Sequence, residues 1–261
     1  NRAVELLATT RTPAMIVGNG VAKASALPEV VKLAELIGAR VYHPWMSEVN
    51  FPVSHPQYLG DLDVGSLRTR EILESVDVLV VIGIPLFRQA FYLPKPLIAT
   101  NTKVIQIDND SWEIAKNFPV AVGIEGDIKV SLAELYDVLQ ERMSAQAHEG
   151  AKTRVKEIAK EKERTTEAFL KKALQERDHV PISISRLMQE LRDALKPDTY
   201  IVDDSWSCSA TLYRSIDFTK PKSFQRAPGG SIGWGMSGSL GVKLAAPDRP
   251  VVAVVGDGSA A

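Results

Sequence analysis

The sequence predicts an α/β protein with two doubly wound parallel-sheet domains, and two observations carry this prediction. Short apolar runs alternate with segments of helical spacing through residues 13–145, and this alternation is typical of parallel strands joined by crossover helices. The alternation begins again over 181–261, after a charged stretch. We therefore predict a central Rossmann-like domain, a charged helical linker over 146–180 and a second α/β domain, with residues 1–12 as a linker stub.

The elements of the first domain follow from its hydrophobic pattern. Strands are predicted where short apolar runs end in turns or charged residues, at 14–17, 39–42, 78–82, 103–107 and 121–124. Helices are predicted where apolar residues recur at helical spacing, at 24–37, 68–75 and 130–142. The stretch 44–63 holds several prolines and is expected to be an irregular, exposed loop.

The second half of the chain opens with a solvated helix. Lys, Arg and Glu are interleaved over 151–178, which indicates a water-facing helix. An amphipathic pattern then predicts a helix over 182–195 that ends at Lys196-Pro197. The remaining predicted elements are a strand at 200–202, a helix at 210–215 and a strand at 251–255.

Composition narrows the classes of function. Lys and Arg number 31 against 32 Asp and Glu, for a net charge of −1, which argues against nucleic acid or an anionic membrane as the main partner. Cys208 is the only cysteine, which excludes an internal disulfide framework and favours a reducing, cytoplasmic location. The longest apolar run, 78–87, is too short to span a bilayer, and no basic-then-apolar leader opens the chain.

The strongest local signal is the turn after the last predicted strand. Asp257 follows the apolar run 251–255 and is flanked by Gly256 and Gly258. Open α/β sheets place ligands at the carboxyl ends of their strands, and glycines let the backbone amides of Gly258 and Ser259 approach phosphate oxygens. A carboxylate beside such amides suits a Mg²⁺ ion bridged to a diphosphate; the structural alternative is a tight turn in which Asp257 caps the next helix.

Two further segments carry weaker signals. The glycine-rich stretch 228–241 contains a G-x-G-x-x-G pattern from Gly233 to Gly238, but the polar residues before it do not form the apolar strand that a dinucleotide fingerprint requires. Its structural alternative is a helix that packs closely on a neighbour. The stretch 203–209 supplies hydroxyl groups and amides at a strand-to-helix turn, which suits either an anion or simple N-capping.

Taken together and in order, these segments resemble a known family. The chain presents Asp-Asp-Ser-Trp-Ser-Cys-Ser after a strand, then Pro-Gly-Gly-Ser-Ile-Gly-Trp-Gly, then Val-Val-Gly-Asp-Gly-Ser. This series resembles the pyrophosphate-binding domain of thiamine-diphosphate enzymes of the pyruvate decarboxylase and acetolactate synthase type. Within that family it is nearest the benzoylformate decarboxylase branch. The upstream half resembles the family's central domain, most closely at 51–56 and 81–88. The resemblance covers nearly all of the chain after Thr12.

The resemblance implies a set of cofactor-binding residues. Asp257 matches the first Mg²⁺ ligand, and Gly256, Gly258 and Ser259 match the residues along the diphosphate. Trp206 and Ser207 match the turn at the other end of the diphosphate. Gly230 matches the glycine whose carbonyl accepts a hydrogen bond from the aminopyrimidine, and Ile232 matches the apolar residue that wedges between the two cofactor rings. The implied activity is that of a carboxy-lyase, which forms a carbanion or enamine at C2 of the cofactor from a 2-oxo acid or aldehyde.

The resemblance also implies what lies elsewhere. The activating glutamate and the second, asparagine Mg²⁺ ligand fall outside this chain, so the chain is expected to be inactive alone. Because family members build each site between two subunits, the intact enzyme is expected to be a homodimer or homotetramer. Gln89-Ala90 follows Phe87-Arg88 where benzoylformate decarboxylases carry a histidine, which leaves an aliphatic or carboligating relative open. An acetolactate-synthase-like transferase with FAD, for which Gly18-Asn-Gly20 is thin support, and a non-catalytic nucleotide-binding module are the alternatives.

Overall fold

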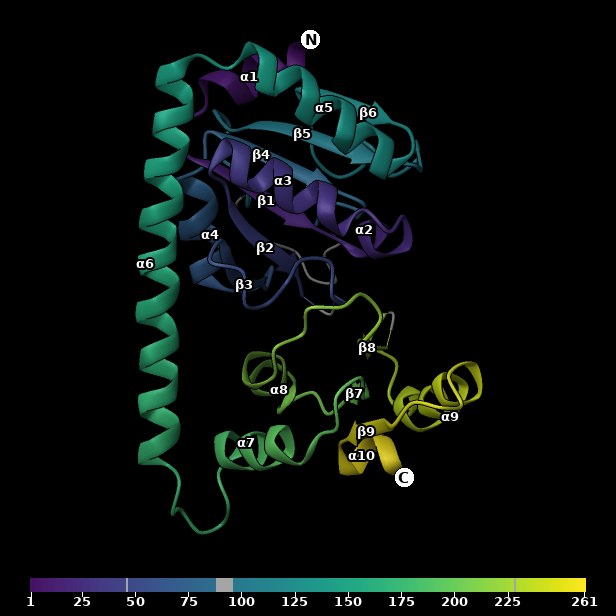
Figure 1. Ribbon diagram of the computed structural model, residues 1–261. Helices are drawn as coiled ribbons and strands as arrows, with labels where there is room; N and C mark the ends of the chain where they lie inside the picture. The colour runs from purple at the N-terminus through teal and green to yellow at the C-terminus, as the bar shows by residue number, and fades with distance from the viewer. Residues whose placement is uncertain (46, 88–95, 228) are drawn as a thin grey trace. The chain divides into compact units, whose positions relative to one another are not determined.

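The computed structural model describes residues 1–45, 47–87, 96–227 and 229–261. The chain divides into two compact units, each with its own sheet (Figure 1). The first unit comprises Asn1–Trp45 and His55–Lys162, and the second comprises Met46–Ser54 and Glu163–Ala261. The two units are therefore interleaved along the sequence. None of the described helices combines the length and the apolar composition that a bilayer crossing needs.

The first unit is built on a six-stranded parallel sheet with the order β3-β2-β1-β4-β5-β6. This is the strand order of dinucleotide-binding folds, in which the direction of winding reverses between β1 and β4. Strands β1 and β4 are buried along their whole length, as their uninterrupted apolar sequences predict. The strands are β1 (Pro13–Val17), β2 (Arg40–Pro44), β3 (Tyr58–Leu62), β4 (Val78–Ile82), β5 (Lys103–Asp108) and β6 (Val122–Glu125).

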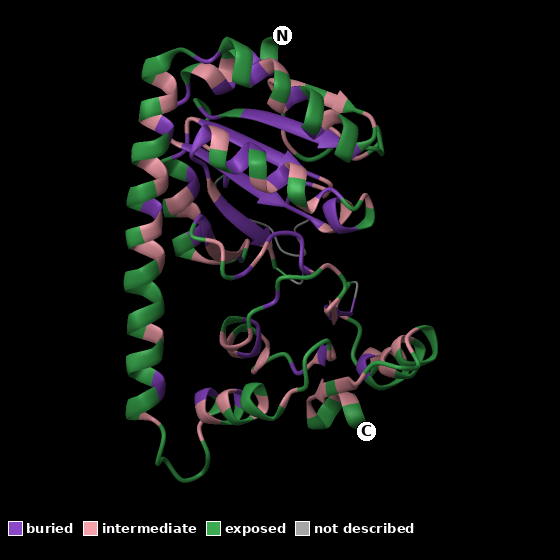
Figure 2. Ribbon diagram, viewed as in Figure 1, coloured by how far each residue is buried: buried purple, intermediate pink, exposed green. Residues whose placement is uncertain are grey.

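Helices cover this sheet, and its core strands are buried throughout (Figure 2). Helices α3 and α5 pack against each other, and α1 packs against α5. Leu73 of α4 joins a separate apolar cluster with Ala14 and Ile16 of β1 and Leu79 and Val81 of β4, residues that alternate along the strands and so share one face. The helices are α1 (Arg2–Thr9), α2 (Asn19–Lys23), α3 (Leu27–Ile37), α4 (Leu67–Glu74) and α5 (Ile128–Arg142).

The start of the chain differs from the prediction. Residues 1–12, expected to be a stub without an element, contain α1, whose Val4 and Leu7 are buried. Asp77 fixes the segment that follows α1: its carboxylate accepts hydrogen bonds from Thr10 Oγ1 at 2.5 Å and from the amides of Arg11 and Thr12 at 2.7 and 3.1 Å. The prediction was wrong because the helix is short and its partners are distant in sequence.

The stretch 44–63 also differs from the exposed loop that the prolines predict. It contains strand β3, and Phe51 and Gln57 are fully buried. Gln57 Nε2 donates hydrogen bonds of 2.8 Å to the carbonyls of both Ala34 and Ala39. Its polar side chain therefore binds one carbonyl in the last turn of α3 and one just beyond the helix, a use that hydrophobic patterning does not reveal.

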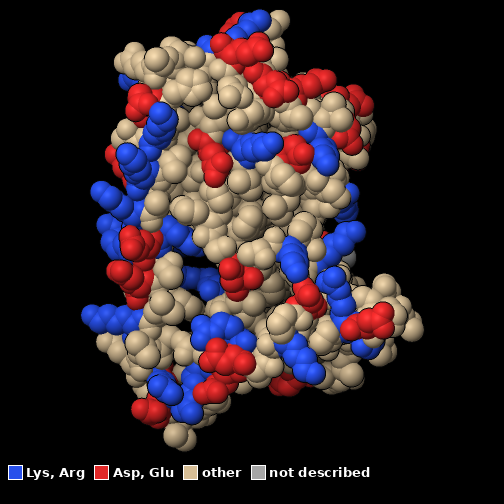
Figure 3. Space-filling model, viewed as in Figure 1, with Lys and Arg blue, Asp and Glu red and all other residues tan. Residues whose placement is uncertain are grey.

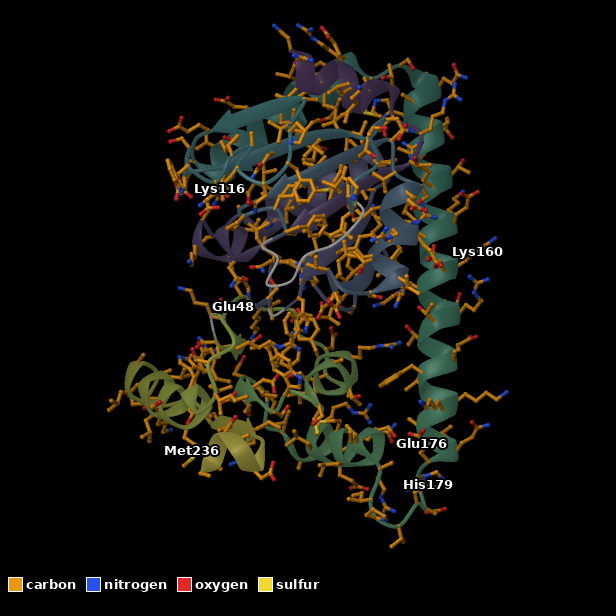
Figure 4. The ribbon with its side chains drawn as sticks, turned by 180° about the vertical axis from the view of Figure 1, so that it is seen from behind. Glu48, Lys116, Lys160, Glu176, His179 and Met236 are labelled. Atoms are coloured by element: carbon orange, nitrogen blue, oxygen red, sulfur yellow. The ribbon has the colours of Figure 1, made fainter. Side chains whose placement is uncertain are left out.

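The charged stretch after α5 is helical, as predicted. Helix α6 (Ala145–Gln175) is 31 residues long, and blue and red side chains are interspersed along it (Figure 3). Just beyond its end, the carboxylate of Glu176 accepts a hydrogen bond of 2.8 Å from Ser185 Oγ (Figure 4). Mixed charges of both signs make this a solvated helix rather than a surface of one sign.

The second unit carries a three-stranded parallel sheet with the order β8-β7-β9. Strand β8 was not predicted, because it has only three residues, alternately buried and half-buried. In its core, the rings of Tyr213, Phe218 and Phe224 pack together with centroids 4.8 to 5.4 Å apart. The elements are α7 (Ile184–Ala194), β7 (Tyr200–Asp204), α8 (Ser209–Ser215), β8 (Phe224–Arg226), α9 (Trp234–Ala245), β9 (Val251–Val255) and α10 (Asp257–Ala260).

An upstream segment completes this unit. Val49, Phe51 and Val53 are buried, and the amide of Val53 donates a hydrogen bond of 3.1 Å to the carbonyl of Phe218. The two all-parallel sheets and their helices confirm the predicted α/β fold class.

Candidate functional site

Two of the predicted segments meet at the carboxyl edge of the three-stranded sheet. Strands β7 and β9 are parallel neighbours, with Asp204 opposite Val255 at the ends of the two strands. Beyond this pair, the amide of Gly256 donates a hydrogen bond of 3.0 Å to the carbonyl of Asp204. The turn after β7 and the Gly-Asp-Gly turn after β9 therefore start side by side.

The glycine-rich segment joins the same edge through the side chain of Asp204. Asp204 Oδ2 accepts a hydrogen bond of 2.9 Å from the amide of Gly235, in the first turn of α9. A Cβ at Gly235 would lie 2.5 Å from Cβ of Asp204, so no larger residue fits without displacement. A Cβ at Gly233 would lie 3.8 Å from the carbonyl oxygen of Ser259, which places the loop before α9 next to α10. All three segments are thus gathered around Asp204.

A buried ion pair lies next to this residue. The side chain of Asp203 is 0% exposed and that of Arg226 is 5% exposed, and Arg226 Nε lies 3.1 Å from Asp203 Oδ2. Asp203 Oδ1 accepts hydrogen bonds from the amide and the hydroxyl of Ser205, at 3.1 and 2.6 Å. Ser209 Oγ donates to Asp203 Oδ2. Asp203 therefore holds the turn after β7 from inside the unit, while Asp204 holds the two neighbouring segments.

The structure places the predicted cofactor residues of the first two segments on exposed loops. Trp206 has a φ of 42° and a side chain that is 68% exposed, and Ser207 beside it is exposed. Gly230 has a φ of 74°, a left-handed conformation that glycine adopts without strain. Ile232 is 78% exposed, and the half-exposed Met236 lies on α9 (Figure 4). Apolar side chains therefore border a polar strand end.

The segment after β9, residues 256–259, differs from the prediction in which backbone amides are free for phosphate. The amide of Ser259, expected to be free for phosphate, donates a hydrogen bond of 3.0 Å to the carbonyl of Gly256. The amides of Asp257 and Gly258 lie in the first turn of α10, where backbone amides lack partners within the helix. Asp257 and Gly258 are exposed, and a Cβ at Gly258 would meet nothing within 4 Å. The available donors are therefore one residue earlier than expected.

A complete metal centre is absent from the described part of the chain. Across residues 1–45, 47–87, 96–227 and 229–261, no three His, Cys, Asp or Glu side chains gather as metal ligands. Asp257 is an exposed carboxylate at the strand end. It can supply one ligand to a cation that also draws on phosphate oxygens and water, which is how Mg²⁺ is commonly held.

The other turn singled out by sequence lies in the first unit. Gly18-Asn-Gly20 follows β1, at the point where the winding of the six-stranded sheet reverses. The amide of Gly20 donates a hydrogen bond of 2.9 Å to the carbonyl of Gly83, and a Cβ at Gly20 would lie 2.6 Å from Cα of Gly83. The backbone of the β4 turn therefore fills the space beside Gly20.

Several sequence-based expectations lie outside the described residues. The positions compared with the benzoylformate decarboxylase histidine are Gln89 and Ala90, which follow Arg88. The first residue of the glycine-rich stretch is Pro228.

Sequence reasoning missed the residues that hold the site together. Asp203 and Asp204 were part of a recognised segment, but their separate roles were not predicted, and Arg226 was not singled out. Two acidic residues at a strand end were the available signal, because alternation along a strand sends neighbouring side chains to opposite faces. Nothing local identified Arg226, which is 23 residues from its partner Asp203.

Two models of known protein families match this chain. The family described as "Thiamine pyrophosphate enzyme, central domain" matches residues 1–135, and "Thiamine pyrophosphate enzyme, C-terminal TPP binding domain" matches residues 206–261. The second match begins at Trp206 and includes the glycine-rich loop and the Gly-Asp-Gly turn.

Curated relatives share similar levels of identity across almost the whole chain. The sulfoacetaldehyde acetyltransferase of Castellaniella defragrans is 30% identical over 98% of this chain and 46% of its own length. The benzoylformate decarboxylase of Pseudomonas aeruginosa is 27% identical over 98% of this chain and 45% of its own. The acetolactate synthase large subunit of Haemophilus influenzae is 28% identical over 99% and 44%. The chain thus spans less than half the length of these relatives.

A solved structure has the same fold. The thiamine diphosphate-dependent 4-hydroxybenzoylformate decarboxylase of Rhodococcus jostii superposes with a TM-score of 0.76 at 23% identity, over 99% of this chain and 45% of that one. The family matches cover both the six-stranded unit and the segments gathered around Asp204. The chain belongs to the thiamine pyrophosphate enzyme family.

Proposed function

We propose that the carboxyl edge of the β8-β7-β9 sheet binds the diphosphate of thiamine diphosphate with Mg²⁺, as part of an enzyme that decarboxylates 2-oxo acids or joins the resulting fragment to an aldehyde or second oxo acid. The observation that carries the proposal is the convergence of three segments on one residue. Asp204 binds the amides of Gly235 and Gly256 through its side chain and its carbonyl.

The residues at this edge fit a diphosphate. The first-turn amides of α10 can donate to anionic oxygens. The space beside Gly258 is open, because a Cβ there would touch nothing within 4 Å. A carboxylate, Asp257, is available next to these amides for a Mg²⁺ ion that the diphosphate would share.

Each predicted residue has a role in this proposal. Asp257 ligates Mg²⁺, and Gly256, Gly258 and Ser259 line one end of the diphosphate, with the hydroxyl rather than the amide of Ser259 as its donor. Trp206 and Ser207 line the other end.

The cofactor's rings are placed by the glycine-rich loop. The carbonyl of Gly230 accepts a hydrogen bond from the amino group of the aminopyrimidine, and the exposed side chain of Ile232 wedges between the two rings. Thiamine diphosphate, when bound, supplies the electron sink for cleavage next to a carbonyl. The contribution of this chain is to anchor and orient the cofactor.

The reaction class rests on the relatives. A benzoylformate decarboxylase and an acetolactate synthase are both among them, and both names fit cleavage of a 2-oxo acid. A second candidate, transfer of an acetyl group, is favoured by the 30% identity to a sulfoacetaldehyde acetyltransferase.

Three further properties belong to the proposal. The proposal does not include FAD. The phosphate of a dinucleotide would approach the turn after β1, and there the backbone of Gly83 lies against Gly20. A cytoplasmic location is proposed from the single cysteine, Cys208. A homodimer or homotetramer is proposed because the family resemblance implies that each site is built between two subunits.

The test uses the intact protein. Calorimetry should show thiamine diphosphate binding that depends on Mg²⁺, and CO₂ should be released from at least one of pyruvate, 2-oxobutyrate and benzoylformate. Supplying sulfoacetaldehyde in place of the 2-oxo acid, and measuring its consumption without release of CO₂, distinguishes the transferase. Absence of cofactor binding at millimolar thiamine diphosphate and Mg²⁺ would refute the proposal.

A further inference from the structure

Asp203 accepts four hydrogen bonds at the proposed site, yet its side chain is not open to solvent. Oδ1 accepts from the amide of Ser205 at 3.1 Å and from its hydroxyl at 2.6 Å. Oδ2 accepts from Ser209 Oγ and from Arg226 Nε, the latter at 3.1 Å. Its side chain is fully buried. Asp203 therefore ties both ends of the turn 205–209 to the end of β7.

Arg226 completes the arrangement from the neighbouring strand. Its Nη2 donates a hydrogen bond of 3.2 Å to the carbonyl of Ser209, in the first turn of α8. The guanidinium carbon lies 5.0 Å from the centroid of the Phe224 ring and 5.4 Å from that of Tyr213. Hydrogen bonding and cation–π contact thus fix the guanidinium group in one orientation.

Between these anchors the backbone adopts a conformation that a tryptophan rarely adopts. Trp206 has a φ of 42°, in the left-handed region where a residue with a Cβ is strained. Such a conformation persists only where the surrounding structure over-determines it. The bonds from Asp203 to Ser205 and Ser209, on either side of Trp206, provide this determination.

We propose that the Asp203–Arg226 ion pair is a positioning pair, which holds Trp206 and Ser207 in the conformation that binds the diphosphate. This inference rests on the proposed function, because it assumes that the turn 205–209 receives a diphosphate. Neither member of the pair touches the cofactor. Both act through the backbone of the turn, so their loss weakens diphosphate binding rather than the chemical step.

The variant Asp203→Asn tests the pair in the intact protein. Asparagine keeps the size of the side chain but removes the charge and leaves only one acceptor oxygen. We expect the dissociation constants of thiamine diphosphate and of inorganic pyrophosphate, each measured with Mg²⁺, to rise about tenfold. The kcat at saturating cofactor should stay within about twofold of wild type, since a group that sets only ground-state binding does not change the chemical step.

Asp77→Asn is the matched control for general destabilisation. Like Asp203, Asp77 accepts several hydrogen bonds, among them those from Thr10, Arg11 and Thr12, but it lies in the first unit. This variant should lower the unfolding midpoint without changing either dissociation constant. Arg226→Lys keeps the charge but cannot reproduce both the bond to Asp203 and the bond to Ser209, so its dissociation constants should lie between those of wild type and Asp203→Asn.

The outcomes separate this inference from the proposed function. If the wild-type protein binds neither thiamine diphosphate nor pyrophosphate, the proposed function fails. If the wild-type protein binds both and folded Asp203→Asn binds them equally well, the positioning role is overturned and the proposed function stands.

If Asp203→Asn does not fold, Ser209→Ala is the variant that tests the positioning role. It removes one hydrogen bond to Asp203 and should raise both dissociation constants about threefold. Unchanged dissociation constants would refute the role.

Discussion

Asp204 binds Gly235 at a distance that leaves no room for a side chain. Its Oδ2 accepts the Gly235 amide at 2.9 Å, and the Cβ of any larger residue at position 235 would lie 2.5 Å from Cβ of Asp204. The carbonyl of the same aspartate accepts the amide of Gly256 at 3.0 Å. One residue at the end of β7 therefore fixes where both α9 and α10 begin.

Gly235→Ala should destabilise the second unit. The added methyl group has to displace either α9 or the end of β7, and overpacking of this kind costs about 1–3 kcal/mol. Gly241→Ala is the control on the same helix, because a Cβ there would meet nothing within 4 Å; it should raise stability by roughly 0.5–1 kcal/mol. Urea unfolding measures both changes, and equal midpoints for the two variants would contradict the close contact.

Asp257→Ala should abolish Mg²⁺-dependent binding of thiamine diphosphate by the intact protein while leaving its fold unchanged. Asp257 is exposed and at the first position of α10, so its removal costs little stability but takes away the carboxylate that is proposed to bind Mg²⁺. Asp248→Ala, an exposed carboxylate just before the other end of β9, is the control. Calorimetry that gives the same cofactor affinity for both variants would refute the metal assignment.

Ile232→Ala should lower the turnover of the intact protein more than its cofactor affinity. In the proposed site this side chain sets the geometry of the rings, whereas the diphosphate anchors binding, and a misplacement of about 1 Å can reduce the rate on the order of a hundredfold. Leu67→Ala is matched in exposure, at 77% against 78%, and lies in the other unit. Unchanged kcat in Ile232→Ala with the cofactor bound would show that Ile232 has no role in the reaction.

The thiol of Cys208 should respond to the charge on Asp203. Burial raises the pKa of Cys208 and the neighbouring Asp203 carboxylate raises it further, because both disfavour the negatively charged thiolate. Asp203→Asn should therefore lower this pKa and speed alkylation by iodoacetamide at neutral pH. The pH profile of the alkylation rate measures the shift. Asp217→Asn, an exposed carboxylate in the same unit, should leave the profile unchanged, and an identical response in both variants would contradict the assignment.

The sequence was sufficient to predict the segments of the site and the edge at which they meet. Asp204 and Gly256 follow parallel strands, and such strands end at the same edge of a sheet, so their proximity follows from topology once the strands are recognised. The apolar run at 251–255 marked one of these strands without ambiguity. Local pattern and parallel pairing are properties that a sequence displays directly.

The remaining features depend on contacts between distant residues. The partner of Asp203 is Arg226, on a strand of three residues that leaves no periodic signal. Helix α1 gains its burial against α5, more than a hundred residues later. The amide of Ser259 is bonded to Gly256 because α10 starts directly after β9, a detail of turn geometry that the glycine pattern did not specify.

The interleaving of the two units has a consequence for how the protein is made. Val53 binds Phe218 through the backbone, so the second unit needs a segment that is translated long before the rest of it. During synthesis the six-stranded unit can complete its sheet before the residues that contact the segment 47–54 have been made. A genetic exchange that moved only residues 163–261 into another protein would leave this segment behind. The two units are therefore expected to be inherited together.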